Sequence, residues 1–159
     1  MPTSSASERD IQDIASAMSS VLPALHRALE RRFAQDFPYP QLPEGQLALL
    51  RLVGERDGVT VRAAADALLM KPNNVSALVT QLAGQGLLER GQDPADKRIA
   101  RLHLTAEARR RLDQAAHLMD GYVIEALHTL TDGDLDAIGS ALGALRGLAR
   151  HIHPAAATS

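Results

Sequence analysis

The chain has 159 residues, which is enough for one domain with a sizeable core, and a formal net charge of −2. Hydrophobic residues make up 45% of it and aromatic residues only 3%, so the core must be built from Leu, Ala, Val and Ile, which suits helix packing. Cysteine is absent, which excludes disulfides, thiolate metal sites and thiol redox sensing.

Residues 1–36 are predicted to form a long amphipathic helix. Apolar residues recur there at steps of three and four and so share one stripe: Ile11, Ile14, Met18, Val21, Leu25, Leu29 and Phe33. Ser5 and Glu8 have the spacing of a capping box, and Pro23 should kink the helix or open a backbone hydrogen bond. Because this helix is longer than one lobe requires, we assign it to dimerisation or to contact with a C-terminal helix.

Three prolines in residues 37–43 end that helix, and a second helix is predicted from Pro43 to about Gly54. Together with the elements that follow, this helix is assigned to a lobe over residues 37–105.

Two short helices and a hairpin complete the lobe. Thr60 has the position of an N-cap for a helix over residues 61–70. Pro72 then forces a new start, and the next helix covers about residues 72–84. Two strands over about residues 87–105 follow, the second with the alternating pattern of a half-buried strand. Helix-turn-helix followed by a hairpin is a winged helix.

The helix over residues 72–84 has an unusual outward face. Surface helices usually carry Glu and Lys, whereas this one carries short amides and hydroxyls, which can donate to and accept from base edges in a major groove. The candidate base-reading residues are Asn73, Asn74, Ser76, Thr80 and Gln81. The alternative interpretation is a merely polar helix near a loop.

The predicted wing has a charged tip with no core to bury. Lys97 and Arg98 are placed to reach phosphates or a narrow minor groove, and Asp93 or Asp96 to orient the guanidinium. The alternative is an ordinary charged hairpin loop.

Charge is distributed unevenly along the chain. Residues 60–111 carry nine basic and five acidic residues, while the remainder has an acidic excess. The candidate contacts to phosphates or the minor groove are Arg62, Lys71, Arg90, Lys97, Arg98 and Arg101. A solvated helix face could also produce a bias of this size.

Residues 106–153 are predicted to form two further amphipathic helices used in dimerisation, and residues 154–159 a tail. The expected fold class is mainly α with a small β-hairpin wing: a winged helix-turn-helix plus an N- and C-terminal helical dimerisation region.

This arrangement resembles the multiple-antibiotic-resistance regulator (MarR) family. Four segments carry the resemblance: Lys71-Pro-Asn-Asn-Val-Ser, Gly86-Leu-Leu-Glu-Arg90, Asp93-Pro-Ala-Asp-Lys-Arg98 and Leu102-His-Leu-Thr105-Ala-Glu-Ala. The resemblance implies a homodimer that binds double-stranded DNA at a palindromic operator, with a recognition helix in the major groove and a wing in the minor groove. It also implies repression, with release by a small aromatic or anionic effector.

Carried over by position, the wing motif implies an ion-paired tip formed by Asp93, Asp96 and Arg98. Ala95 stands where family members often have a basic residue, so one contact to DNA is missing.

An effector site is expected near the first two helices, where a cation and aromatic walls would suit an anionic ring compound. The candidates are His26, Arg27, Phe33, Phe37 and Tyr39. The alternative is that the two phenylalanines cap the core and Arg27 is solvated.

Several other functions are excluded or disfavoured. The six histidines lack the close pairing that zinc sites require, so no metal or other cofactor is expected. There is no nucleophile elbow, phosphate-binding loop or HExxH motif, so the protein is not expected to be an enzyme. No apolar run is long enough for a membrane span and no signal peptide is evident, which indicates a cytoplasmic protein with no membrane partner.

The sequence therefore predicts a dimeric, sequence-specific DNA-binding transcriptional regulator. The rival hypothesis is a helical dimerisation module whose winged helix binds protein instead of DNA, which the net charge and Ala95 favour slightly.

Overall fold

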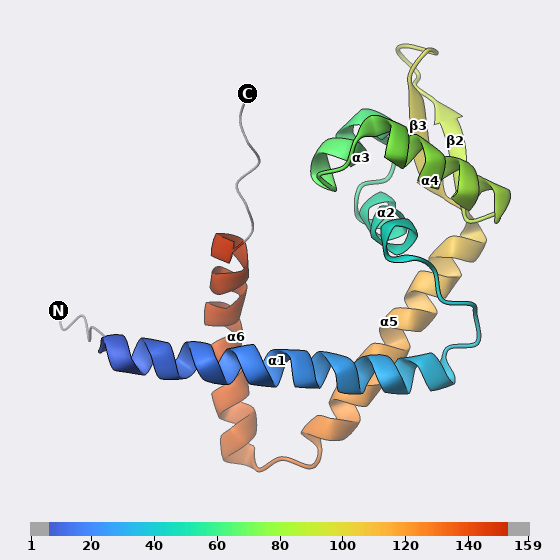
Figure 1. Ribbon diagram of the computed structural model, residues 1–159. Helices are drawn as coiled ribbons and strands as arrows, with labels where there is room; N and C mark the ends of the chain where they lie inside the picture. Colours follow the sequence, from blue (N-terminus) through green and yellow to red (C-terminus); the bar gives the residue numbers. More distant parts are fainter. Residues whose placement is uncertain (1–6, 153–159) are drawn as a thin grey trace. The chain divides into compact units, whose positions relative to one another are not determined.

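The computed structural model describes residues 7–152, which form two compact units that divide between Met119 and Asp120. The elements in chain order are α1 (Glu8–Asp36), α2 (Glu44–Glu55), β1 (Val59–Thr60), α3 (Val61–Ala67), α4 (Pro72–Gly84), β2 (Leu88–Gln92), β3 (Ala100–Leu104), α5 (Ala106–Leu127) and α6 (Asp132–Ile152) (Figure 1). A mainly helical chain with one small antiparallel sheet confirms the predicted fold class. The predicted tail, residues 154–159, lies outside the described residues.

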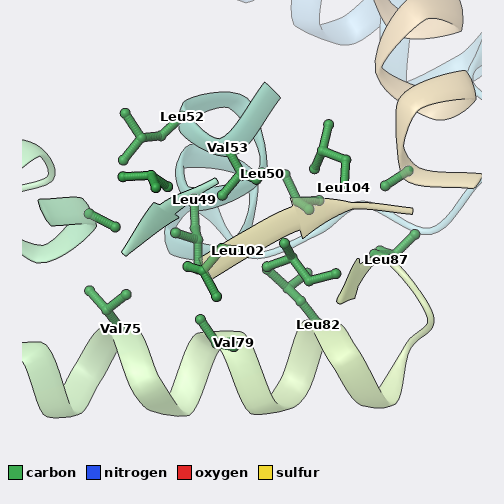
Figure 2. Close-up of a cluster of buried hydrophobic side chains, with 14 of the residues drawn as sticks. Leu49, Leu50, Leu52, Val53, Val75, Val79, Leu82, Leu87, Leu102 and Leu104 are labelled. Atoms are coloured by element: carbon green, nitrogen blue, oxygen red, sulfur yellow. The ribbon is translucent and has the colours of Figure 1, made fainter. Parts of the chain in front are cut away.

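The core of the lobe is an apolar cluster between α2, α4 and the sheet (Figure 2). Val75, Val79 and Leu82 of α4 are fully buried because their spacing of four and three places them on one helix face. They pack with Leu49 and Leu102, which are also fully buried. Each such side chain contributes about 1.5–3 kcal/mol on burial. This packing fixes which face of α4 turns outward.

The sheet has the order β1-β3-β2, with both pairs antiparallel. Strand β1 is a difference from the sequence prediction, which placed only a turn and a helix cap there. Val59 pairs with Leu102, and Thr60 both ends the strand and caps α3 by accepting a hydrogen bond from Ala63 N at 3.1 Å. Two residues are too short for an alternating pattern, so the sequence gives no signal of this strand.

Helix α1 begins at a capping box that differs from the expected one. Ser7 accepts from the Asp10 amide at 3.2 Å, and the Asp10 carboxylate accepts from the Ser7 amide at 3.0 Å. The Ser5 of the expected pair lies outside the described residues. Pro23 lies within the helix, which continues through it to Asp36.

Helix α3 is shorter than predicted, because the chain leaves the helical conformation at Leu69. This residue has φ of 53°, in the left-handed region, and a side chain that is 68% exposed. The amide of Met70 donates to the Ala65 carbonyl at 2.9 Å, which closes the helix end. Leu69 therefore adopts a backbone conformation that suits glycine better.

Neither α1 nor α6 contains a buried residue among the described residues. Both carry large apolar side chains that remain exposed. On α1 these are Ile11, Ile14, Val21, Leu22 and Leu25, and on α6 they are Leu135, Ile138, Leu142, Leu145, Leu148 and Ile152. Each helix thus has an apolar stripe that the chain's own core does not use.

Leu69→Gly should stabilise the lobe. The left-handed conformation costs a non-glycine residue about 1–2 kcal/mol. Glycine removes this cost but loses about 0.5–1 kcal/mol of stability, because it is more flexible in the unfolded chain. The net gain in the free energy of unfolding is roughly 0.5–1 kcal/mol. Leu69→Ala, which keeps the conformational cost, is the matched control. Urea denaturation measures both, and a glycine variant no more stable than the alanine variant contradicts this account of the turn.

Candidate nucleic-acid interface

The outward face of α4 consists of the residues that the sequence places there. Asn73, Asn74, Ser76, Thr80 and Gln81 are all exposed. Since the opposite face of the helix is held in the core, these short polar side chains are presented on a fixed support. Within the described residues, the side chains of Asn73, Asn74 and Ser76 make no hydrogen bond, so their donors and acceptors remain available to a ligand.

Thr80 differs from its neighbours because its hydroxyl is already engaged. It donates to the Ser76 carbonyl at 3.0 Å and accepts from the Arg90 guanidinium at 3.2 Å. Arg90 comes from β2, so this contact joins the wing to α4. Arg90 therefore lies against α4 and has fewer donors left for phosphate than the sequence suggests.

Gln81 is held by a buried residue of α2. Gln46, only 6% exposed, donates from its amide to the Gln81 side-chain oxygen at 3.0 Å and accepts from the Gln85 amide at 3.2 Å. Gln81 lies on α4, and Gln85 is the C-cap residue directly after it. Gln46 is one of two buried polar residues among the described ones, and the sequence analysis did not single it out.

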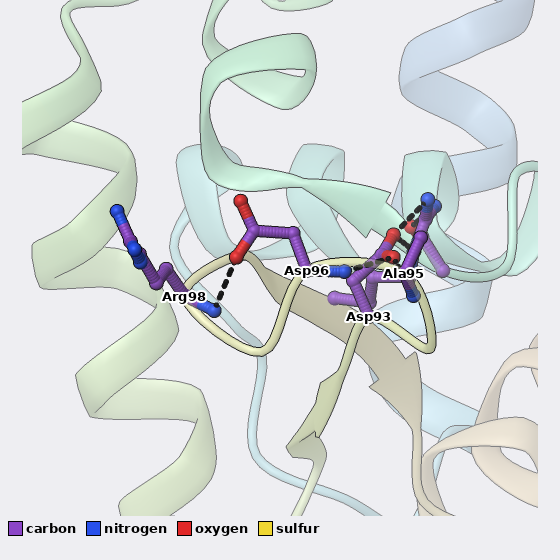
Figure 3. A network of polar contacts seen from close by, with 6 residues as sticks. Asp93, Ala95, Asp96 and Arg98 are labelled. Atoms are coloured by element: carbon purple, nitrogen blue, oxygen red, sulfur yellow. Dashed lines mark hydrogen bonds and ion pairs between the residues drawn. The ribbon is translucent and has the colours of Figure 1, made fainter.

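The other buried polar residue is Asp93, which organises the wing (Figure 3). One carboxylate oxygen accepts from the backbone amides of Ala95 at 2.7 Å and Asp96 at 3.1 Å. The other accepts from Nε of Arg101 at 2.5 Å, and the Nη2 of Arg101 completes a two-pronged ion pair. Arg101 also donates to the Gly58 carbonyl at 2.9 Å. One carboxylate thus folds the loop and joins it to β3.

This arrangement differs from the predicted tip of Asp93, Asp96 and Arg98. The structure pairs Asp93 with Arg101, because Gly91 lies opposite Arg101 in the sheet and Asp93, two residues on, is its diagonal neighbour. Asp96 accepts instead from the backbone amide of Arg98 at 3.0 Å and makes no ion pair within residues 7–152. Arg101, a predicted phosphate contact, is engaged by the protein itself.

The hydrogen bonds to Asp93 also control its charge. Donation from the amides of Ala95 and Asp96, together with the contact to Arg101, holds the pKa of the Asp93 carboxyl below its usual value of 3.8. The wing loop is therefore organised around a carboxylate that stays ionised to a lower pH than an ordinary aspartate does.

A second contact joins the base of the wing to the turn before β1. His103 Nδ1 lies 3.0 Å from a carboxylate oxygen of Asp57. The carbonyl of the neighbouring Gly58 accepts a hydrogen bond from Arg101. The ring of His103 also lies over Gly91, where an added Cβ would be 2.9 Å from Nε2. Sequence reasoning treated His103 as a scattered histidine, and no local pattern indicates a partner 46 residues away.

Four of the predicted phosphate-binding residues remain uncommitted. The side chains of Arg62, Lys71, Lys97 and Arg98 are exposed and make no ion pair or hydrogen bond to the described residues. Arg62 also lines a shallow hollow of about 380 Å³, together with Thr60, Val61, Ile99 and Ala100. These cations lie at the start of both helices of the helix-turn-helix and at the wing tip.

The predicted effector residues are brought together only in part. Phe33 stacks on Phe37 with ring centroids 4.6 Å apart, and Phe37 meets the edge of Tyr39 at 5.2 Å. The cation over Tyr39 is Arg111, 4.3 Å from the ring centroid. Arg111 is oriented by Glu107, whose carboxylate accepts from its Nε at 2.6 Å. The hollow described above lies elsewhere.

The two polar members of the predicted effector set do not join this cluster by any recorded contact. His26 is exposed and pairs with Glu30, one turn along α1, at 3.2 Å, and Arg27 is exposed. The described residues also contain no group of three potential metal ligands and no helix long and apolar enough to cross a membrane.

A family model, a relative and two solved structures match this chain. A sequence model of the MarR family matches residues 41–99. The transcriptional regulator HosA of Escherichia coli O111:H- is 29% identical over 92 residues, 58% of this chain and 68% of HosA. A candidate transcriptional regulator from Pseudomonas aeruginosa PA01 is 27% identical, with a TM-score of 0.74 over 91% of this chain and 98% of its own. Streptococcus pneumoniae FabT, solved in complex with DNA, is 17% identical, with a TM-score of 0.70 over 90% and 99%.

Asp93→Asn should make the lobe less stable at neutral pH but not in strong acid. Because the folded pKa of this carboxyl is depressed, its contribution is complete above the unfolded value of about 3.8 and is lost as the pH falls through the lower folded pKa. The free energy of unfolding, measured in urea from pH 7 to pH 3, should show the variant and wild type converging in acid. Asp66→Asn, at an exposed position in the same lobe, should leave the difference from wild type constant; a constant difference for Asp93→Asn as well contradicts its role.

Proposed function

Since this chain belongs to the MarR family of transcriptional regulators, and is not an enzyme, we propose that it is a dimeric, sequence-specific DNA-binding protein that represses from a palindromic operator. The observation that carries the proposal is the outward face of α4, a row of short amides and hydroxyls on a helix whose other face is fixed in the core. Such groups match the donors and acceptors of base edges in a major groove.

Within this proposal, α4 enters the major groove and reads bases through Asn73, Asn74, Ser76 and Gln81, with Thr80 acting jointly with Arg90. Changing Asn74 should alter the preferred sequence in a selection from random duplexes.

Contacts to the DNA backbone are assigned to the exposed cations without protein partners. Arg62 lies near the start of α3 and Lys71 directly before α4, and both are assigned to phosphates of the DNA backbone. Lys97 belongs to the wing tip and is assigned to a phosphate as well. Arg98 is assigned to the minor groove, as its guanidinium is uncommitted while its backbone is held by Asp96. Arg101 is assigned to positioning the wing and not to contact with phosphate.

Dimerisation is assigned to residues 1–36 and 106–153. The supporting observation is that α1 and α6 have exposed apolar stripes and no buried residue among those described. A two-fold dimer places its recognition helices about 34 Å apart, one turn of DNA.

Within the same proposal, a small aromatic or anionic effector releases the protein from DNA. The stacked rings of Phe33 and Phe37, next to Tyr39 and Arg111, offer aromatic surface and a cation. We assign the protein to the cytoplasm, where its DNA target lies.

The rival function, binding of a protein partner by the winged helix, is favoured by the net charge of −2 and by Ala95 at the wing. The two functions differ in their response to salt, because phosphate contacts release counterions and an apolar protein interface does not.

A fluorescence-anisotropy titration with duplexes from the protein's own promoter, at two or more salt concentrations, tests the DNA function. We expect affinity to fall steeply with salt. Arg98→Ala should weaken binding by about 1–3 kcal/mol and reduce the magnitude of the salt slope by about 1.

Arg101→Met is the matched comparison. It should weaken binding through a displaced wing while leaving the salt slope unchanged, because Arg101 is occupied by Asp93 and Gly58. An Arg101 variant that lowers the slope as Arg98→Ala does would return Arg101 to the phosphate contacts. The absence of binding to any duplex at low salt would reject the DNA function.

Leu142→Glu should convert the dimer to a monomer, because it places a charge in the apolar stripe of α6. Ser140→Glu, exposed and about half a turn away, is the control and should remain dimeric. Light scattering after size-exclusion chromatography measures the mass of each. A Leu142→Glu protein with twice the mass of one chain would remove α6 from the dimer interface.

A further inference from the structure

The side chain of Gln46 is buried next to α4 and is not exposed for contact with DNA. It is 6% exposed and belongs to α2, and it hydrogen-bonds to Gln81 of α4 and to Gln85, the residue directly after α4, 35 and 39 positions further along the chain. A buried polar group of this kind is costly unless its hydrogen bonds are made. Here they are made to the helix that carries the proposed base-reading residues.

We propose that Gln46 is a positioning residue that determines which base Gln81 reads. The inference rests on the proposed function, since it requires α4 to enter the major groove. It adds to that function a specificity determinant that touches no DNA.

The two ends of the Gln81 side-chain amide face different surroundings. A glutamine side chain has one acceptor oxygen and one donor NH₂ group. The oxygen of Gln81 accepts from Nε2 of Gln46 at 3.0 Å, so it is turned toward α2. The NH₂ group is then left on the exposed side of the helix, where Gln81 lies. Gln81 therefore presents its donors to the groove, while its oxygen already accepts one hydrogen bond and faces α2.

Base edges distinguish a donor from a complete amide. Adenine is read by an amide that donates to N7 and accepts from the N6 amino group, which needs both ends of the side chain. Guanine presents two acceptors, N7 and O6, and no donor at that edge. A Gln81 that offers only its NH₂ group therefore favours guanine over adenine at the position it reads.

Asn74 provides an internal comparison. It lies seven residues before Gln81, two turns along the same side of α4, and is likewise exposed. Within the described residues its side-chain amide makes no hydrogen bond, so both the oxygen and the NH₂ group remain available to a base. Asn74 can therefore make the adenine contact, which Gln81 is not oriented to make while its oxygen accepts from Gln46.

The hydrogen bond at the other end of Gln46 offers a control. Gln85 donates to the Gln46 oxygen at 3.2 Å and is itself exposed. Gln85→Ala removes that contact and leaves the bond between Gln46 and Gln81. Gln46→Met, by contrast, keeps the length and shape of the buried side chain while removing its donor, which frees the Gln81 oxygen.

The test is a selection of preferred sites from random duplexes with the full chain, followed by affinity measurements on the selected site and its guanine-to-adenine variant. For wild type and Gln85→Ala we expect guanine at the two symmetry-related positions read by Gln81. For Gln46→Met we expect the ratio of guanine to adenine affinities there to fall at least about fivefold, the lower end of what one paired base contact contributes. The positions read by Asn74 should not change.

Gln81→Glu tests the same point without altering the core. The carboxylate can still accept from Gln46, but it has no donor for the groove, so the guanine preference should disappear at those two positions. This variant carries the test if Gln46→Met does not fold, which a thermal unfolding curve reveals.

The outcomes separate this inference from the function it rests on. A wild-type protein that selects a defined site, with a Gln46→Met protein that selects the same base at every position, overturns the role of Gln46 and leaves the DNA function intact. A guanine preference that survives in Gln81→Glu does the same. A wild-type protein that binds no duplex overturns both.

Discussion

The packing of α4 against the sheet is the constraint on which the rest of the lobe depends. Val75, Val79 and Leu82 bury one face of this helix completely, so its rotation about its own axis is fixed by the core and not by any ligand. The polar residues of the opposite face acquire a defined direction in consequence. A recognition surface made of short side chains requires this, because amides and hydroxyls have little reach with which to correct a misplaced helix.

Two buried polar residues add hydrogen bonds to the positioning that the apolar core provides. Gln46 and Asp93 are the buried polar side chains among the described residues, and each holds one of the two elements proposed to touch DNA. Gln46 orients a side chain on α4, and Asp93 closes the wing loop and fixes it to Arg101. Each polar side-chain atom of both residues makes a hydrogen bond, so their burial fixes the local geometry. The proposed interface is therefore positioned by two buried residues that lie outside it.

The sequence predicts those parts of the structure that depend on local periodicity. The apolar spacing of α4, the alternation of Leu102 and Leu104 in β3 and the cap at Thr60 are all local patterns, and the structure has each of them. The contacts that organise the interface join residues far apart: Gln46 to Gln81 over 35 residues, and Gly58 to Arg101 over 43. No local pattern encodes them. For this reason the sequence placed Arg101 on phosphate, whereas the sheet register places it beside Asp93.

In the proposed complex, the outward face of α4 lies in a major groove, once for each subunit of the dimer. Protection of guanine N7 from methylation by dimethyl sulfate, measured on the selected duplex, reads the major groove directly. We expect two symmetry-related clusters of protected guanines whose centres lie about one helical turn, roughly 10 base pairs, apart. A bound complex in which every major-groove guanine is methylated as in free DNA would contradict this placement of α4.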